Sequence, residues 1–513
     1  MSLPLVIQGG MGVGVSGWRL AHAVAAGGQL GVVSGTALDT VMVRLLQSGD
    51  NDGYIRKALK HFPFPNLAQQ ILDRFYQTAD AATSNATQQE KRRFKLLPLI
   101  QANMSSFRKG LLVAANFVEV FLAKAGLLPV TNDLTALQWQ VGINYLEKIQ
   151  LALLPGLYGA MLAGVDVVLI GAGIPDKIPE ALDRLARHEL ATITMDVIDG
   201  VEGDGRLLFE PAKLWEDQGL SCPLAPLKRP AFLPIISAAT LARALLKKAP
   251  TGIDGFIVEG HIAGGHNAPP RGGIQLTPGG EPLYGTRDQI DLKQMSMLGK
   301  PFWLAGGYGS SEHLTAARAE GATGIQVGTL FAFCEESGLT PMLKHRFLEK
   351  LLGSGECHDH AESPVFTDPL ASPTGFPFKV ALLSETLSEA ELYDNRPRLC
   401  DLGYLRRAYR ATDGTIHYRC PGEPIDDYIK KGGQLEETQG RKCLCNALVA
   451  NLGLGQNRAV EDVFYEEVPL LTAGNDIDCV RPLISPQRLS YSARDVLDLL
   501  LASREHPKIS SNA

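Results

Sequence analysis

Glycines that follow two apolar runs form the strongest chemical signal in the sequence. The segment from Phe302 to Phe331 holds both runs, of which the first ends in Gly306 and Gly307 and the second in Gly328 and Thr329. Glycine lets the backbone approach a ligand closely, and N–H groups near the start of a helix bind phosphate. We predict a phosphate site formed by these loops. The alternative is that the glycines only make tight turns.

A glycine-rich loop with two histidines follows another apolar run. The run ends at Glu259, and the loop after it contains His261, Gly264, Gly265 and His266. A histidine at the carboxyl end of a barrel strand can exchange protons with a molecule bound above the barrel. The pattern therefore suggests an acid or base. The alternative is a histidine that only caps the loop by hydrogen bonding.

Two further strand ends could face a flat ring. Gln8, Gly9, Gly10 and Met11 follow the first apolar run, and Asn144 ends a later one. Glycines would let the ring lie against the backbone, and Asn144 offers both a donor and an acceptor to the edge of a heterocycle. The glycine spacing differs from the dinucleotide fingerprint, and no acidic residue follows at the required place.

The elements that must position these residues are nine short apolar runs rich in β-branched residues, most of them separated by helix-compatible segments. They span residues 3–8, 30–34, 141–145, 165–170, 191–195, 232–237, 255–258, 302–305 and 324–327. Continuous apolar runs are typical of parallel strands buried on both faces, and eight such strands with intervening helices close a TIM barrel. We predict an α/β fold of the TIM (β/α)8 type, with one strand in surplus and an excursion from the barrel over residues 196–228.

The rhythm of strands and helices divides the chain into four parts. Charged and apolar residues alternate at helical spacing in 53–76 and 107–125, and after Leu343 the rhythm stops in a loop-rich region. We predict that the barrel begins in 1–52, is interrupted by a helical insertion in 53–140, continues in 141–343 and is followed by an appended C-terminal region in 344–513.

The composition favours a globular protein that acts on a small molecule. The chain has 513 residues, 45% of them hydrophobic and 20% charged, with a formal net charge of -6. Its basic residues are scattered, which argues against a nucleic-acid partner. No signal-peptide pattern opens the sequence, and glycines, Pro155 and Asp166 interrupt its most apolar stretch. We therefore expect a cytoplasmic location and no membrane span.

Four cysteines near the end of the chain form a possible metal site. Cys400, Cys420, Cys443 and Cys445 lie close together in the sequence. Four thiolates can complete a tetrahedral zinc site or hold an iron-sulfur cluster. Reduced cysteines can equally pack as small hydrophobic side chains. Both interpretations stay open.

The four strand ends together resemble those of the nitronate monooxygenase family, also called 2-nitropropane dioxygenases, and of the related FMN-dependent enoyl-acyl-carrier-protein reductases. The resemblance covers roughly residues 3–34 and 141–337. The residues that carry it are Gln8, Gly9, Gly10 and Met11, then Gly142, Ile143 and Asn144, then Ile262 to His266, then Ala305, Gly306 and Gly307, and finally Gln326, Val327, Gly328 and Thr329.

The resemblance implies non-covalently bound FMN, with Asn144 against the flavin ring and His266 as the acid or base. Many nitronate monooxygenases carry a lysine on the strand that reads Leu233 to Ser237 here, and in this respect the sequence is closer to the enoyl reductases. The expected cofactor contacts are Gln8, Gly9, Gly10, Met11, Asn144, Glu259, Gly264, Gly265, Ala305, Gly306, Gly307, Gln326, Gly328 and Thr329.

The function we expect is oxidation of a small activated carbon acid, such as a nitronate, with electrons passing through FMN to oxygen. The second hypothesis is reduction of an activated double bond on a carrier-bound acyl chain, with NADH or NADPH as the donor. The third is a non-catalytic flavin-binding module that assembles with other proteins. The sequence does not indicate the oligomeric state.

Overall fold

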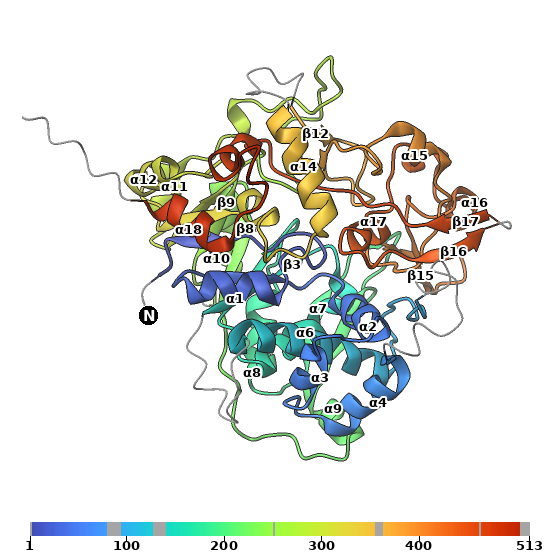
Figure 1. Cartoon of the computed structure of the whole chain (residues 1–513). Coiled ribbons are helices and arrows are strands. Elements are labelled where there is room, and N and C mark those ends of the chain that lie inside the picture. The colour runs from blue at the N-terminus through green and yellow to red at the C-terminus, as the bar shows by residue number, and fades with distance from the viewer. Residues whose placement is uncertain are drawn as a thin grey trace, which may run out of the picture.

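Eight parallel strands form the central sheet of the protein (Figure 1). The structure is a computed structural model that describes residues 3–78, 94–126, 140–249, 252–353, 363–460 and 463–502. The strands follow the order β1-β11-β10-β9-β8-β4-β3-β2. Their bounds are β1 (Val6–Gln8), β2 (Gly31–Ser34), β3 (Val141–Leu146), β4 (Val167–Gly171), β8 (Ala231–Ile236), β9 (Phe256–Glu259), β10 (Phe302–Ala305) and β11 (Gly324–Val327).

The two edge strands of this sheet meet and close it into a barrel. Ile7 and Leu30 form a parallel bridge. The Gln8 amide donates to the Leu30 carbonyl at 2.9 Å, and the Leu30 amide donates to the Val6 carbonyl at 3.2 Å. The predicted TIM-type fold is therefore confirmed.

Both faces of the barrel strands are buried, which explains their continuous apolar runs. One cluster of buried side chains consists almost entirely of strand residues, among them Ile7, Val32, Leu233, Ile257 and Trp303, and it fills the barrel interior. A larger cluster joins the outward-facing strand residues to the surrounding helices. This packing fixes the strand ends on which the predicted site residues lie.

Helices from the beginning, the middle and the end of the sequence surround the barrel. They are α1 (Trp18–Ala26), α2 (Leu38–Gln47), α7 (Gln150–Leu162), α8 (Ile178–Ala186), α10 (Ala239–Lys248), α11 (Leu292–Ser296), α12 (Ser311–Ala319), α13 (Thr329–Ala332), α14 (Pro341–Gly353) and α18 (Ala493–Leu501). Helix α18 packs against α1, and the two lie side by side in Figure 1.

Helices make up much of the described part of the segment predicted as a helical insertion. It contains α3 (Tyr54–Leu59), α4 (Pro65–Phe75) and α6 (Ser106–Ala125). The Ser105 side chain caps α6 by accepting from the Arg108 amide. Helix α6 packs against α1, α7 and β3, and a Cβ atom at Gly159 of α7 would collide with the Val113 carbonyl. Helix α6 is therefore packed directly onto the barrel.

The surplus strand of the sequence analysis lies outside the barrel. Strand β5 (Ala191–Thr194) pairs antiparallel with β7 (Arg206–Phe209), and α9 (Pro211–Asp217) follows. Strand β6 (Val197–Ile198) pairs with the distant β14 (Arg407–Arg410). The excursion from the barrel thus begins with β5, slightly earlier than the predicted residue 196.

The C-terminal region is anchored on the helices next to the barrel. It contains β12 (Val365–Asp368), β13 (Phe378–Ala381), α15 (Ala390–Asn395), β14, β15 (Ile416–Arg419), α16 (Ile425–Lys430), α17 (Leu444–Ala450), β16 (Asn457–Val460) and β17 (Val463–Glu466). The Tyr404 hydroxyl donates to Asp39 of α2 at 2.6 Å, and Arg108 of α6 pairs with the same carboxylate at 2.5 Å. Buried polar contacts therefore join distant parts of the chain.

Within the described ranges, no helix is both long enough and apolar enough to span a membrane.

Candidate functional site

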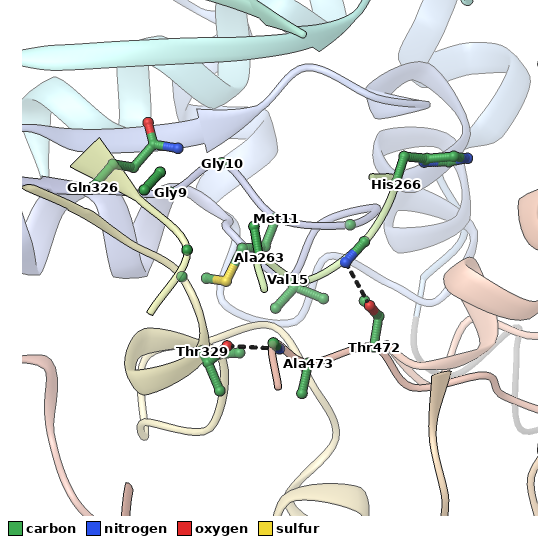
Figure 2. A pocket seen from close by; sticks show the side chains of 18 of the residues that line it. Gly9, Gly10, Met11, Val15, Ala263, His266, Gln326, Thr329, Thr472 and Ala473 are labelled. Carbon is green, nitrogen blue, oxygen red and sulfur yellow. Dashed lines mark hydrogen bonds between the residues drawn. The ribbon is translucent and has the colours of Figure 1, made fainter. Parts of the chain in front are cut away.

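A cavity of about 230 Å³ opens at the carboxyl ends of the barrel strands (Figure 2). It is lined by the predicted site residues Gly9, Gly10, Met11, Asn144, Glu259, Gly264, Gly265, His266, Ala305, Gly306, Gly307, Gln326, Gly328 and Thr329. Ligands of TIM barrels bind at this end, because the strand-end loops converge there. The structure therefore brings almost all of the predicted site residues to one cavity.

Gln8 does not line the cavity and instead supports the loop after β1. Its Nε2 donates to Ser16 Oγ at 2.8 Å, and its Oε1 accepts from the Val32 amide at 3.0 Å. Ser16 Oγ also accepts from the Met11 amide at 2.8 Å. Gln8 thus holds in place the backbone on which Gly9 and Gly10 lie.

The loop after β10 has a backbone shape that requires glycine. Gly306 and Gly307 have φ angles of +85° and +83°. A Cβ atom at Gly306 would lie 2.9 Å from the Gly260 carbonyl oxygen and 3.0 Å from the Ala263 nitrogen. Helix α12 begins shortly after this loop and is capped by Ser310. The arrangement brings bare backbone to the cavity wall, as a phosphate site needs.

Two amide side chains that line the cavity have oxygens without partners. Asn144 Nδ2 donates to the Gly10 carbonyl at 3.1 Å, while Asn144 Oδ1 is buried and no described residue donates to it. The same holds for Gln326 Oε1. Buried acceptors are normally hydrogen-bonded. These two oxygens therefore mark places where a ligand with N–H donors would be bound.

His266 is held in a fixed orientation beside the cavity. Its Nε2 lies 2.7 Å from Ser372 Oγ, which in turn contacts Thr374 Oγ1 at 2.8 Å. Its ring packs edge-on against Phe378, with 4.9 Å between ring centroids. Burial lowers the pKa of His266 to about 4, so the imidazole is neutral near pH 7. A neutral imidazole can still donate one hydrogen bond.

Glu259 ends strand β9, and its side chain lines the same cavity. Burial raises the pKa of its carboxyl group to about 7. None of the described residues forms a hydrogen bond or an ion pair with this carboxyl group. Glu259 thus presents an unpaired carboxyl group to the cavity.

A strap from the C-terminal region, residues 471–479, completes the cavity wall. The Gly265 amide donates to Thr472 Oγ1 and the Gly474 amide to Thr329 Oγ1, each at 2.9 Å (Figure 2). The Asn475 amide donates to the Ile262 carbonyl at 3.0 Å. The strap thus ties the histidine loop to the loop after β11. The sequence patterns did not predict the strap, although its small residues Ala473 and Gly474 permit this close approach.

Removing the Thr472 hydroxyl should loosen the histidine loop. Thr472→Val keeps the side-chain shape but leaves the Gly265 amide without its acceptor, at a cost of about 1–3 kcal/mol. We expect faster hydrogen exchange at Gly265, measured by mass spectrometry of peptides that cover the loop. The matched variant Thr415→Val, in a turn that bonds Asp413, should leave this exchange unchanged. If hydrogen exchange at Gly265 were equal in both variants, the Thr472 hydroxyl would not hold the histidine loop.

The four clustered cysteines lie near one another in the C-terminal region. Burial, and then the neighbouring thiols Cys400, Cys445 and Cys443, raise the pKa of Cys420 well above its usual value. Burial likewise raises the pKa of Cys400 to about 12. Across the described ranges, no group of three or more His, Cys, Asp or Glu side chains could hold a metal ion. The predicted zinc or iron-sulfur site therefore has no support from the structure.

The fold and the site together define a (β/α)8-type barrel protein with a ligand cavity of glycine turns and unpaired amide oxygens. Residues 226–357 match the family model described as nitronate monooxygenase. In this part of its barrel the chain is similar to the nitronate monooxygenase family, whose members are flavin-dependent oxidoreductases.

The individual relatives match over a limited part of their length. A probable nitronate monooxygenase of Staphylococcus saprophyticus is 33% identical over 112 residues, which make up 22% of this chain and 30% of that protein. A 5-hydroxy-7a-methyl-1-oxo-octahydro-1H-indene-4-carboxyl-CoA dehydrogenase of Rhodococcus jostii is 32% identical over 118 residues, which make up 23% of this chain and 28% of that protein. The matched part thus spans less than a third of either relative.

Among solved structures, FabK from Thermotoga maritima aligns with a TM-score of 0.43 and 15% identity, over 97% of this chain and 91% of that one.

Proposed function

We propose that the protein is an FMN-dependent oxidoreductase that oxidises a small activated carbon acid of the nitronate type, with oxygen as the final electron acceptor. The observation that carries the proposal is the cavity at the strand ends, which is lined both by left-handed glycines and by two amide side chains with unpaired oxygens. The match of residues 226–357 to a flavin-dependent family supports it.

The residues present fit FMN. Gly306 and Gly307 line the cavity without side chains, so a phosphate could approach their backbone. Asn144 Oδ1 and Gln326 Oε1 are acceptors that a heterocycle with N–H groups can satisfy. Met11 and Val15 add apolar surface to the same wall. When bound, FMN would supply the electron transfer that no side chain can perform.

His266 is the proposed contact for the reacting part of the substrate. Ser372 fixes the ring through Nε2, so the imidazole can contact a substrate without first being ordered. Because its pKa is lowered to about 4, the neutral ring is suited to hydrogen bonding an anionic substrate oxygen. The strap and Phe378 border the same space, which keeps water away from the substrate.

A second cavity favours the alternative substrate class, a carrier-bound acyl chain. It has a volume of about 200 Å³, adjoins the first cavity and has apolar walls that include Ile236, Leu241 and Phe376. A longer apolar chain could occupy it while its activated double bond reached the flavin. In that case NADH or NADPH would reduce FMN first.

Anaerobic reduction of the flavin separates the two functions. The purified protein, loaded with FMN, would be mixed with ethylnitronate, NADH or NADPH in the absence of oxygen, and the flavin absorbance followed. The proposal predicts rapid bleaching by the nitronate and slow bleaching by both nicotinamides. Rapid bleaching by either nicotinamide would support the reductase instead. Protein that stays colourless with excess FMN would refute both.

A further inference from the structure

We propose that Glu119 of helix α6 is a positioning residue for the flavin cavity, because its carboxyl group holds the loop between β1 and α1 in shape. This inference rests on the proposed function, since it concerns how the FMN site is kept ready for the cofactor. It also gives a role to the helical insertion, to which α6 belongs.

The loop between β1 and α1, residues 9–17, forms part of the cavity wall. Gly9, Gly10, Met11, Gly12 and Val15 all line the cavity. The loop contains no charged residue. Its shape therefore depends on the hydrogen bonds that its backbone makes with neighbouring groups.

Ser16 closes this loop on itself. Its Oγ accepts from the Met11 amide at 2.8 Å and donates to the Gly9 carbonyl at 2.9 Å. The Ser34 amide of β2 donates to the Ser16 carbonyl at 2.8 Å. Helix α1 begins two residues later, at Trp18. The position of Ser16 therefore depends on how the start of α1 is held.

Glu119 holds the start of α1 from the neighbouring helix. Gly17 precedes the helix and has no side chain that could accept from its first amides. The Trp18 amide instead donates to Glu119 Oε1 at 2.6 Å. A Cβ atom at Gly17 would lie 3.5 Å from this oxygen and 3.3 Å from the Gly14 carbonyl oxygen. Helices α1 and α6 pack against each other (Figure 1). The insertion thus supplies the cap that the sequence of α1 lacks.

Glu119 acts on the cavity only through this loop, because it lines neither of the two cavities. Without its carboxyl group the Trp18 amide would lose this acceptor, and the start of α1 would be released. The flavin would then have to order residues 9–17 as it binds. Ordering of this kind lowers the apparent affinity for a ligand.

Hydrogen exchange in the apoprotein tests the loop in the absence of FMN. Glu119→Leu removes the acceptor, whereas Glu119→Gln keeps the side-chain shape and one acceptor oxygen. In peptides that cover residues 9–18, we expect exchange to be about 10-fold faster in Glu119→Leu, because an amide left without its acceptor costs about that factor. Glu119→Gln should restore most of the protection.

Titration of the same proteins with FMN, followed by flavin fluorescence, tests the link to the cofactor. Glu119→Leu should bind FMN on the order of 10-fold more weakly than the wild type, because the loop is ordered only when the flavin binds. Glu119→Gln should bind FMN nearly as tightly as the wild type. Rescue by glutamine would show that the hydrogen bond, and not the loss of packing, sets the affinity.

The matched control is Glu281→Leu. Glu281 is also partly buried and also accepts from a backbone amide at 2.6 Å, that of Thr367, but it lines neither cavity and lies outside residues 9–17. This variant should leave both the exchange of residues 9–18 and the affinity for FMN unchanged.

The pH dependence of the loop has a definite sign. Burial raises the pKa of Glu119 from its ordinary value of 4.5 to about 7, while the Trp18 amide and Arg19 oppose this shift. An open loop would expose the carboxyl group to water and lower its pKa. Closure is therefore favoured at low pH, and this contribution is lost as the pH rises through about 7. Between about pH 6 and pH 8 the wild-type loop should lose protection relative to Glu119→Gln.

Other groups near this contact also carry charge or titrate. Arg19 of α1 acts on Glu119 and pairs with Asp52 at 2.6 Å. Further titratable side chains near the contact are those of His22 of α1, Tyr54 and Lys57 of α3, and His61. All of them are present in Glu119→Gln as well, so a difference between the two proteins at the same pH belongs to residue 119.

Three results would overturn the inference. The first is exchange of residues 9–18 that is no faster in Glu119→Leu than in the wild type, and the second is faster exchange without weaker FMN binding. Should Glu119→Leu not fold, an equal response of the wild type and Glu119→Gln to pH is the third. Failure of the proposed function is a different result, namely a wild-type protein that binds no FMN, and exchange would then still decide whether Glu119 holds the loop.

Discussion

Gly306→Val is expected to weaken FMN binding by about 100-fold or more. Gly306 has a φ angle of +85°, a conformation that costs a residue with a side chain about 1–3 kcal/mol. The new Cβ atom would also lie 2.9 Å from the Gly260 carbonyl oxygen, so the loop would have to move. Every 1.4 kcal/mol corresponds to a tenfold change in affinity. The backbone strain at position 306 and the displacement of the loop together account for the expected loss of FMN affinity.

Equilibrium titration of the apoprotein with FMN, followed by flavin fluorescence, would measure this loss. Gly299→Ala is the control, because Gly299 also has a positive φ angle of +65° but its added Cβ would meet open space away from the cavity. The control variant should be somewhat less stable and bind FMN normally. If Gly306→Val bound FMN as tightly as Gly299→Ala, the phosphate would not lie at this loop.

His266→Ala should lower kcat/KM for oxidation of ethylnitronate by about 100- to 1000-fold. The neutral imidazole is held by Ser372 and Phe378, so it can donate to the substrate oxygen at no ordering cost. Loss of one such preorganised donor typically lowers a rate by this amount. Steady-state oxygen consumption would measure it.

The contribution of the hydrogen bond that orients the ring can be measured separately. Ser372→Ala, which frees the ring but keeps it, should have an intermediate effect. Unchanged flavin oxidation and reduction in His266→Ala would leave the cavity without its proposed substrate contact.

Much of the barrel and of its site could be predicted from the sequence, because each barrel strand and each glycine turn leaves a pattern in a short stretch of residues. Strands buried on both faces leave continuous apolar runs, and glycine is required where the backbone turns with positive φ, as at Gly306 and Gly307. The surplus strand β5 could not be resolved in this way, because its apolar run resembles that of a barrel strand. Only the antiparallel pairing of β5 with β7 distinguishes β5 from a strand of the barrel.

The C-terminal contribution to the site could not be predicted for a different physical reason. Thr472 and Gly474 contact loops that lie more than a hundred residues earlier in the chain, and a single threonine hydroxyl carries no periodic signal. The pKa shifts of Glu259 and His266 were equally hidden. Both shifts are caused by burial, in the case of His266 beside Phe378, and only the folded structure brings the neighbours together.

The strap also determines when the protein can become active during its synthesis. Because residues 471–479 supply part of the cavity wall, a growing chain that already contains all eight barrel strands still lacks the bond from Gly265 to Thr472. The wall of the cavity is therefore complete only after the strap has been synthesised and has docked on the histidine loop.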